Sequence, residues 1–194
     1  MKAVLQRVVQ ASVEVNGQQI SKIKQGLCVL VGLSAEDTSA DLDYMVQKLL
    51  TVKVFDSNTC ASGAIAESAN GDAAVEEQAP PKMWAKNVID IGGEILCVSQ
   101  FTLYAKAMKK GKLDFHLSMK SAQAKEMYHD FLDRLKAAYV PERIKDGEFG
   151  AMMMVNIAND GPVTIEFDSQ ESQSSSNGKN GSSSNTTAGK SSRP

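Results

Sequence analysis

Hydrophobic and polar residues alternate over 4–15 in the way that is typical of a β-strand, in which successive side chains point to opposite faces. Asn16-Gly17 comes next. Because both residues tolerate a positive φ, the pair predicts a hairpin turn and a returning strand. The apolar run at 27–33 lies between a glycine and a serine. A short apolar run with such ends favours a strand that is buried on both faces.

Two later segments have helical periodicity instead. Apolar residues recur at intervals of three or four between Ala40 and Leu50 and again between Ser121 and Tyr139. This spacing places them on one face of a helix. Pro141 follows the second segment and fits a helix that ends shortly before it.

Further segments return to strand character, and they cover about 52–55, 89–103 and 148–168. The last one is divided at 159–162 by Asn-Asp-Gly-Pro, which predicts a turn between two strands. Many strands with two helices predict an α+β fold of the layered α/β type. We expect a strand-rich core of antiparallel or mixed sheets in a β/β/α arrangement, with the two main helices covering a sheet face.

One domain over residues 1–168 accounts for this pattern. Within it, Ser, Asn, Gly, Ala and Glu dominate the stretch from about 57 to 81, which we interpret as a surface insertion. Residues 169–194 contain no large apolar residue. Such a segment buries too little surface to offset its ordering entropy, so we predict a disordered Ser/Asn/Gly-rich tail.

Charge and cysteine content narrow the range of functions. The net charge is −2, so a contact with nucleic acid requires a local basic patch. Cys28, Cys60 and Cys97 are widely spaced, which argues against a disulfide framework and a zinc site. We expect no metal and no other cofactor. No apolar stretch approaches the roughly 18 residues of a membrane span, so we expect a cytoplasmic protein without a membrane partner.

The first candidate site is the polar end of an apolar strand. The run at 95–98 continues into Ser99, Gln100, Phe101 and Thr102. These residues also fit a plain strand end that faces water. Alternatively, backbone N–H groups and the hydroxyls of Ser99 and Thr102 point into a cleft, where such donors suit an ester carbonyl that becomes negative during attack. No histidine adjoins Ser99, so we do not expect an activated serine nucleophile.

The second candidate is Gly161-Pro162, directly before another apolar run at 163–167. The pair fits a simple turn, because proline is tolerated at the first position of a strand. It also fits a rigid wall of main chain, which would reject a substrate by its shape rather than by hydrogen bonds.

A basic run follows the first candidate site and comprises Lys106, Lys109, Lys110 and Lys112. It is either a solvated loop or a phosphate-binding patch, since lysines beside a pocket hold nucleic acid without reading its sequence. His116 lies just beyond it, and we interpret it as a partly exposed loop residue.

Two motifs, SQFTL at 99–103 and NDGPVT at 159–164, together resemble the signature pair of the D-aminoacyl-tRNA deacylases. The likeness extends over nearly all of residues 1–168 and includes the stretches QRV at 6–8 and FGAMM at 149–153. It implies an enzyme without cofactor that hydrolyses the ester bond of D-aminoacyl-tRNA, and of glycyl-tRNA, and releases free D-amino acid and tRNA.

The resemblance also implies roles for the residues of the second motif. The family is a homodimer whose active sites are completed across the interface. Gly161-Pro162, joined by a cis peptide, would enter the partner's pocket and screen chirality, and Arg7 would fix its orientation. Asn159 and Met153 are assigned to the same substrate-binding group.

For the first motif, the resemblance implies that Ser99, Gln100, Phe101 and Thr102 line the pocket for the 3′-terminal adenosine and the aminoacyl ester. Catalysis would rely on the terminal 2′-hydroxyl of the tRNA. An alternative remains, because some animal members with C-terminal extensions are described as DNA-unwinding-element-binding proteins. A nucleic-acid-binding protein of that type would depend on the basic residues of the tail at 179, 190 and 193.

Overall fold

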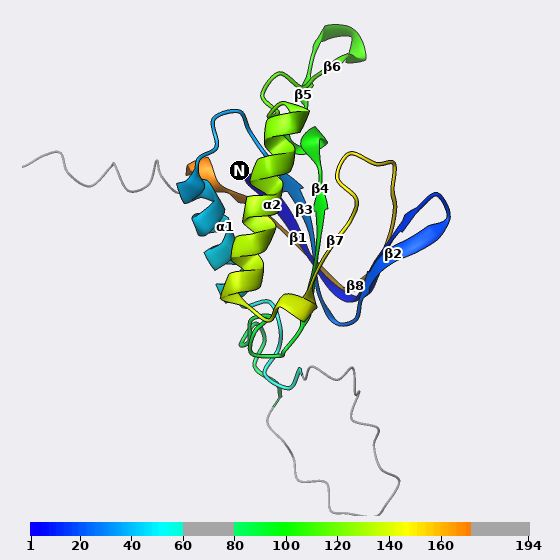
Figure 1. Cartoon of the computed structure of the whole chain (residues 1–194). Coiled ribbons are helices and arrows are strands. Elements are labelled where there is room, and N and C mark those ends of the chain that lie inside the picture. The colour runs from blue at the N-terminus through cyan, green and yellow to red at the C-terminus, as the bar shows by residue number, and fades with distance from the viewer. Residues whose placement is uncertain (60–79, 172–194) are drawn as a thin grey trace, which may run out of the picture.

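The computed structural model describes residues 1–59 and 80–171 of the chain. Within them, one mixed sheet contains β1 (Lys2–Val15), β2 (Gln18–Ile23), β3 (Gly26–Gly32), β4 (Glu94–Ser99), β7 (Ile144–Asp146) and β8 (Met154–Asp168) (Figure 1). The long strand β1 pairs antiparallel with β2, β3 and β8. The pairs β3–β4 and β4–β7 are parallel.

Two long helices lie over one side of this sheet (Figure 1). They are α1 (Ser39–Thr51) and α2 (Ser121–Ala138), and both agree with the helices predicted from periodicity. Helix α1 begins at a capping box: the N–H of Thr38 donates to Asp41 Oδ2 at 2.8 Å, and the N–H of Asp41 donates to the Thr38 side chain. These contacts satisfy backbone donors that a helix start leaves free.

A small hairpin, β5 (Lys106–Ala107) and β6 (Leu113–Asp114), projects from the body of the molecule (Figure 1). Three single turns of 3₁₀ helix complete the described elements, namely η1 (Phe101–Tyr104), η2 (Lys109–Gly111) and η3 (Pro141–Arg143).

The central strands are buried on both faces, as predicted for the run at 27–33. Alternate residues of β3 and β4, such as Val29 and Cys97, belong to the core beneath the helices. The residues between them, such as Cys28 and Leu96, belong to a second core on the other face. This second core lies against the far half of β1 and Ile23 of β2. The three layers confirm the predicted α+β class.

Strand β1 serves both cores because its side chains change faces partway along. Leu5 packs in the first core, whereas Ala11 and Val13 pack in the second. In a regular strand all three would share a face. Between Val8 and Gln10, however, β1 advances two residues while β8 advances one. The extra residue is a β-bulge, which moves every later side chain to the opposite face.

Strand β8 contains a second irregularity. Gln6 of β1 pairs with Thr164 and Val8 pairs with Asn159, so residues 160–163 of β8 all lie opposite Arg7. The prediction of two strands separated by a turn was therefore wrong. The chain forms one strand with a wide bulge, because pairing with β1 resumes on each side of it. The Gly161–Pro162 peptide bond in this bulge is cis.

Two other predicted strands are shorter than expected. Residues 52–55 form only an isolated bridge between Phe55 and Lys86. The segment at 89–103 contains only the strand β4. The N–H of Gln100 still donates to the carbonyl of Val31 at 2.7 Å, and the chain then leaves the sheet because η1 begins at Phe101. The 3₁₀ turn η1 can then pack closely over β3. Gly32 permits this, because a Cβ there would lie 3.0 Å from the Cβ of Leu103.

The residue that follows the predicted domain, Ser169, contacts the start of the chain. Ser169 is buried, and the ammonium group of Met1 donates to its Oγ at 2.6 Å. The same ammonium group forms a fully buried ion pair with Asp37. Residues 60–79 of the predicted insertion and 172–194 of the predicted tail lie outside the described residues.

Replacing Asp37 by Asn should lower the free energy of unfolding by about 3 kcal/mol, because removing one partner of a buried ion pair leaves the other charge without compensation. Urea denaturation measures the loss. Asp43→Asn is the matched control, since Asp43 pairs with Arg134 at an exposed position, where ion pairs contribute little. Equal losses in the two variants would show that the buried ion pair contributes no more to the free energy of unfolding than the exposed one.

Alkaline pH should also destabilise the fold through its buried thiols. Burial raises the pKa of Cys28 from 9.0 to about 11, and burial also raises the pKa of Cys97. Because the unfolded chain releases these protons first, stability is complete below pH 9 and falls as the pH rises toward 11. Between pH 8 and 10, a Cys28→Ala/Cys97→Ala variant should lose about 2 kcal/mol less than the parent in urea titrations. Parallel losses would contradict this account.

Candidate functional site

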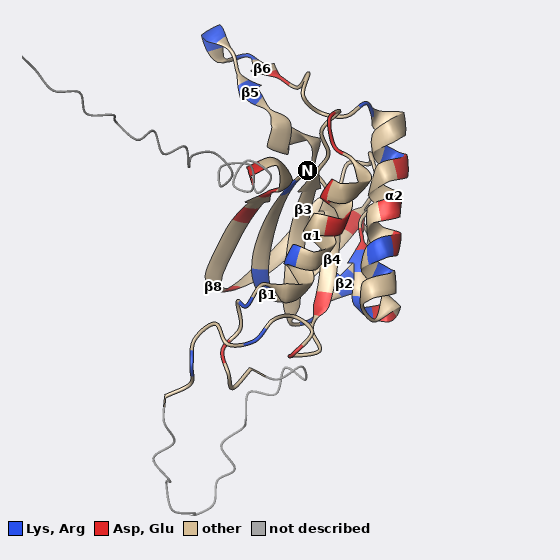
Figure 2. Cartoon of the chain, turned by 90° about the vertical axis from the view of Figure 1, so that its left-hand side faces the viewer, with Lys and Arg blue, Asp and Glu red and all other residues tan. Residues whose placement is uncertain are grey.

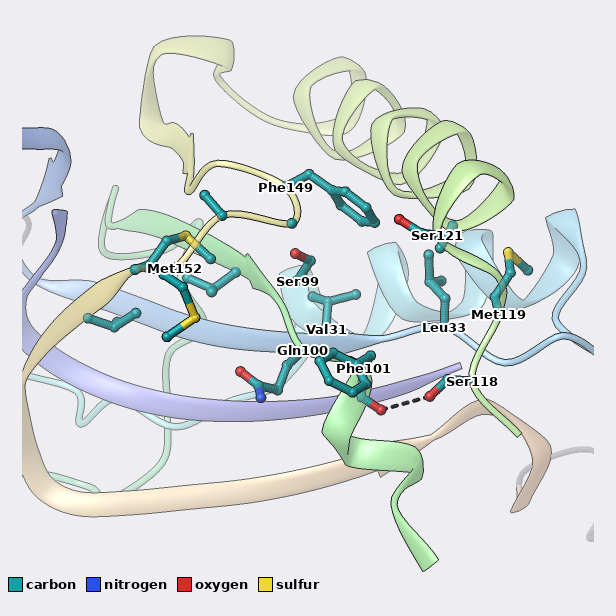
Figure 3. A pocket seen from close by; sticks show the side chains of 16 residues that line it. Val31, Leu33, Ser99, Gln100, Phe101, Ser118, Met119, Ser121, Phe149 and Met152 are labelled. Carbon is teal, nitrogen blue, oxygen red and sulfur yellow. Dashed lines mark hydrogen bonds between the residues drawn. The ribbon is translucent and has the colours of Figure 1, made fainter. Parts of the chain in front are cut away.

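A cavity of about 570 Å³ lies at the carboxyl end of β4 (Figure 3). The strand end contributes one wall, the segment before α2 and its first turns a second, and the loop before β8 a third. The residues of these walls are Ser99, Gln100, Phe101, Ser118, Met119, Ser121, Ala124, Phe149, Gly150, Ala151, Met152 and Met153. Val31, Leu33, Val98 and Val155 complete the lining.

The SQFTL motif turns the chain at the rim of this cavity. Ser99, Gln100 and Phe101 line it, whereas Thr102 does not. The Gln100 side-chain amide donates to Thr102 Oγ1 at 2.5 Å. The N–H groups of Phe101 and Thr102 donate to no acceptor among the described residues. They are the first donors of the 3₁₀ turn, which has no intrahelical partners for them.

The loop before β8 was largely missed by sequence reasoning. Of the stretch at 149–153, only Met153 was assigned to the site, although all five residues line the cavity. Phe149 packs against Tyr128 of α2 with ring centroids 5.7 Å apart, and the N–H of Glu148 donates to Met153 Sδ at 3.3 Å. These contacts hold the loop over the cavity. The FGAMM motif itself was the available signal.

Ser118 and Met119 were also missed, since nothing in their local sequence distinguishes them from a linker. The fold brings them to the cavity by pairing this linker with the end of β3: the N–H of Met119 donates to the carbonyl of Leu33 at 2.9 Å. The Ser118 hydroxyl then donates to the carbonyl of Phe101 at 2.8 Å (Figure 3). This contact joins two walls of the cavity.

The cavity lining contains no charged side chain and no histidine. Among the described residues, the Ser99 hydroxyl forms no hydrogen bond with a histidine or a carboxylate. A serine without a neighbouring base is a poor nucleophile. The site therefore offers shape, hydroxyl and amide groups, and backbone donors.

Arg7 holds the bulge of β8 in place. Its Nη1 donates to the carbonyl of Val54 at 2.5 Å, and its Nε donates to the carbonyl of Asp160 at 3.2 Å. Nε also lies 3.2 Å from Asp160 Oδ2. The Arg7 side chain is only 12% exposed, so these are charge-assisted contacts in a partly dry environment.

Gly161 has a φ of +116°, and a Cβ there would lie 3.1 Å from Arg7 Nη2. Only glycine adopts this conformation readily. Gly161, Pro162 and Asn159 are exposed and do not line the cavity of their own chain. The structure thus places SQF and Met153 together but leaves the Gly-Pro bulge outside their cavity.

The four predicted lysines follow η1 on the β5–β6 hairpin (Figure 2). Lys106, Lys109, Lys110 and Lys112 are all exposed. Lys110 has a φ of 64° and Gly111 a φ of 73°, which give the hairpin its tight tip.

Comparison with known proteins identifies the family. The family described as D-Tyr-tRNA(Tyr) deacylase matches residues 4–168. D-aminoacyl-tRNA deacylase 1 of Homo sapiens is 50% identical over 169 residues, which cover 87% of this chain and 70% of that one. The D-aminoacyl-tRNA deacylase of Saccharomyces cerevisiae is 44% identical over 171 residues, covering 88% of this chain and 100% of that one.

Two solved structures have the same fold. The structure of the c-Myc DNA unwinding element binding protein is 49% identical, with a TM-score of 0.72, and the match covers 87% of this chain and 98% of that one. A probable eukaryotic D-amino acid tRNA deacylase, 18% identical with a TM-score of 0.63 over 86% of this chain and 97% of that one, shares the fold. The family match and the two deacylase relatives define the chain as an enzyme, a hydrolase. It belongs to the D-Tyr-tRNA(Tyr) deacylase family.

Within the described residues, no group of histidine, cysteine, aspartate and glutamate side chains is arranged to hold a metal ion. No helix in the same part of the chain combines the length and apolarity needed to cross a bilayer.

Replacing Arg7 by Lys should lower the free energy of unfolding by about 2 kcal/mol, because an ammonium group cannot reach Val54 and Asp160 together and charged hydrogen bonds contribute about 1.5–3 kcal/mol each. Urea denaturation measures the change. Arg143→Lys is the matched control, since Arg143 Nη1 forms one hydrogen bond, to the Tyr139 hydroxyl at 3.2 Å. If both variants lose the same stability, the multiple contacts of Arg7 have no added effect.

Proposed function

We propose that the chain hydrolyses the ester bond of D-aminoacyl-tRNA, and of glycyl-tRNA, and releases free amino acid and tRNA. The family supports this substrate class. The observation that carries the mechanism is the separation of the two motifs. The cavity holds Ser99, Gln100 and Phe101, and the exposed Gly161-Pro162 bulge lies outside it. A complete site then requires the bulge of a second copy.

In the proposed homodimer, the bulge of one subunit enters the cavity of its partner. Apolar side chains on and beside the strands that bear the bulge support such an interface, since they are exposed in a single chain. They are Val9, Met152, Met154 and Ile157. Asn159, next to the bulge, would enter the same composite site.

The composite site selects by exclusion. Attractive contacts differ by only about 1–3 kcal/mol per methylene, so they cannot separate D from L residues of every side-chain type. A rigid stretch of main chain can reject any L side chain by shape. Glycine has no side chain to reject, which explains why glycyl-tRNA is included among the substrates.

The proposed reaction adds water to the ester carbonyl carbon and breaks the bond to the terminal ribose oxygen, which leaves with a proton. The N–H group of Phe101, which lines the cavity and donates to no acceptor among the described residues, is suited to stabilise the negative carbonyl oxygen. The adjacent ribose hydroxyl assists, since the cavity lining has no basic side chain. The Thr102 hydroxyl, bound by Gln100, is not the nucleophile.

The lysines of the hairpin supply the charge for an RNA substrate. Lys106, Lys109, Lys110 and Lys112 would contact phosphates near the cavity. The proposed setting is the cytoplasm, which suits the two buried, unpaired thiols Cys28 and Cys97.

A DNA-binding function of the kind named for one related structure is the alternative. The tail residues that it was predicted to use, at 179, 190 and 193, lie outside the described residues. The cavity and the bulge favour the deacylase.

Replacing Pro162 by Gly should reduce the preference for D- over L-tyrosyl-tRNA at least about tenfold, because glycine removes the ring and frees the backbone that forms the wall. Thr102→Ala should keep kcat within about tenfold of the parent, since a lost general acid or base would cost more. Hydrolysis of both tRNAs by both variants provides the measurement.

An inactive Thr102→Ala protein with intact fold and tRNA binding would overturn the RNA-assisted mechanism.

The shared site is tested by mixing the subunits of two variants. A Pro162→Gly chain keeps its cavity but loses the rigid bulge that it would lend to its partner. A Ser99→Trp chain keeps its bulge but has a tryptophan that blocks its own cavity. If sites are composite, mixed dimers regain one normal site and its D selectivity. No recovery from subunits shown to exchange would mean that each chain works alone.

A further inference from the structure

The β5–β6 hairpin stands directly on the rim of the cavity. It begins after η1, whose Phe101 lines the cavity, and it ends before Ser118 and Met119, which line it too. The Ser118–Phe101 hydrogen bond of 2.8 Å ties the two ends together, and Ser118 bridges to Ser34 beyond the end of β3. The base of the hairpin is therefore fixed relative to the cavity.

Ion pairs within the described residues leave the positive charge of the hairpin without a partner. It contains four exposed lysines, and no ion pair joins their ammonium groups to a carboxylate within the described residues. Its one acidic residue, Asp114, is engaged elsewhere: Oδ1 accepts from the His116 N–H at 3.1 Å, and Oδ2 contacts His116 Nδ1. Asp114 therefore does not pair with Lys106, its neighbour across the hairpin.

Aromatic rings lie between this charge and the cavity. Phe101 is 60% exposed, and its ring meets Phe115 edge to face, with centroids 5.1 Å apart and planes at 62°. Met108 and Leu113 of the hairpin are exposed as well. The main cores contain none of these side chains, and the Phe115 ring is partly exposed.

We infer that the hairpin and Phe115 form a track for the unpaired nucleotides that precede the terminal adenosine of the RNA substrate. This inference rests on the proposed function, which places that adenosine in the cavity. Exposed aromatic rings beside a basic strand suit single-stranded nucleic acid, because unpaired bases stack on the rings while lysines follow the phosphates. The face of a base within a duplex is already stacked and is not available.

The track assigns Phe115 and His116 a role that neither motif includes. Phe115 stacks on a base one or two nucleotides before the adenosine. His116, with Nδ1 directed to Asp114, is left with Nε2 for a phosphate or a ribose hydroxyl. The acceptor duplex would then lie beyond the lysines at the tip.

The binding test uses uncharged RNA, so it does not depend on catalysis. A labelled RNA hairpin with the unpaired 3′ sequence ACCA is compared with the same hairpin ending blunt, by fluorescence anisotropy. The parent should prefer the overhang about tenfold. Phe115→Leu, which keeps an apolar side chain but no ring, should weaken overhang binding at least about fivefold and leave blunt binding unchanged.

Replacing Lys109 and Lys112 by Ala should make the salt dependence of overhang RNA binding shallower. The negative slope of log binding constant against log salt concentration should decrease in magnitude by about 1.4, since each phosphate contact in a single strand contributes about 0.7. Lys53→Ala/Lys125→Ala, with the same loss of charge at exposed positions elsewhere, should keep the parent slope. Equal affinity of the parent for the two RNAs, or equal slopes in the two double variants, would overturn the track.

A kinetic test separates the track from the function on which it rests. The Phe115 and Lys109/Lys112 variants should lose at least about fivefold more kcat/KM on D-tyrosyl-tRNA than on D-tyrosyl-adenosine, which has no preceding nucleotides. Equal losses on both substrates would overturn the track. If the parent hydrolyses neither substrate, the proposed function fails, and the binding test still decides whether the track exists.

Discussion

The contact between Arg7 and the bulge of β8 is the constraint on which the candidate site depends. The guanidinium joins Val54, which lies between α1 and the insertion, to Asp160 at the start of the bulge. Arg7 lies on β1, which both cores share. The bulge is thus fixed to a strand that contributes side chains to both cores, although Gly161 and Pro162 are themselves exposed. A side chain that met only solvent would give this bend no fixed position.

In the cavity, as in the bulge, main-chain groups form the functional surface and neighbouring residues fix their position. The backbone bend after Ser99 lies close to β3, where the absence of a Cβ at Gly32 leaves room for Gln100 and Leu103. The result is a site lined by apolar, hydroxyl and amide side chains, with preset backbone donors and no titratable group in its lining. Such donors need no reorganisation when charge develops, which is the condition for electrostatic stabilisation of a transition state.

Local signals predicted the parts of the fold that local interactions determine. The two helices follow from periodicity, and the Asn16-Gly17 turn and the doubly buried β3 follow from short patterns. The continuity of β8 did not follow, because it depends on pairing with β1 about 150 residues away in sequence. The bulge sequence looks like a turn in isolation, and only the partner strand shows that the chain continues in the same sheet.

The candidate site shows the same division. Ser99 and Gln100 were candidates from sequence because they interrupt an apolar pattern that packing alone would continue, and both line the cavity. Ser118, Met119 and Phe149 were not, because tertiary pairing carries otherwise ordinary segments to the cavity. The resemblance implied a role for Arg7 in orienting Gly161-Pro162. Its contacts with Val54 and Asp160 depend on the tertiary structure and could not be read from the sequence.

The double burial of β3 and β4 has a consequence for how the protein opens. Each strand packs against the helices with one set of side chains. The other set packs against the far half of β1 and Ile23 of β2. Neither layer can detach without exposing these shared strands to water, so the two cores are coupled through β3 and β4. The amide hydrogens of Val29 and Cys97 should then exchange with solvent only through global unfolding. During catalytic turnover, β3 and β4 would therefore remain paired and buried.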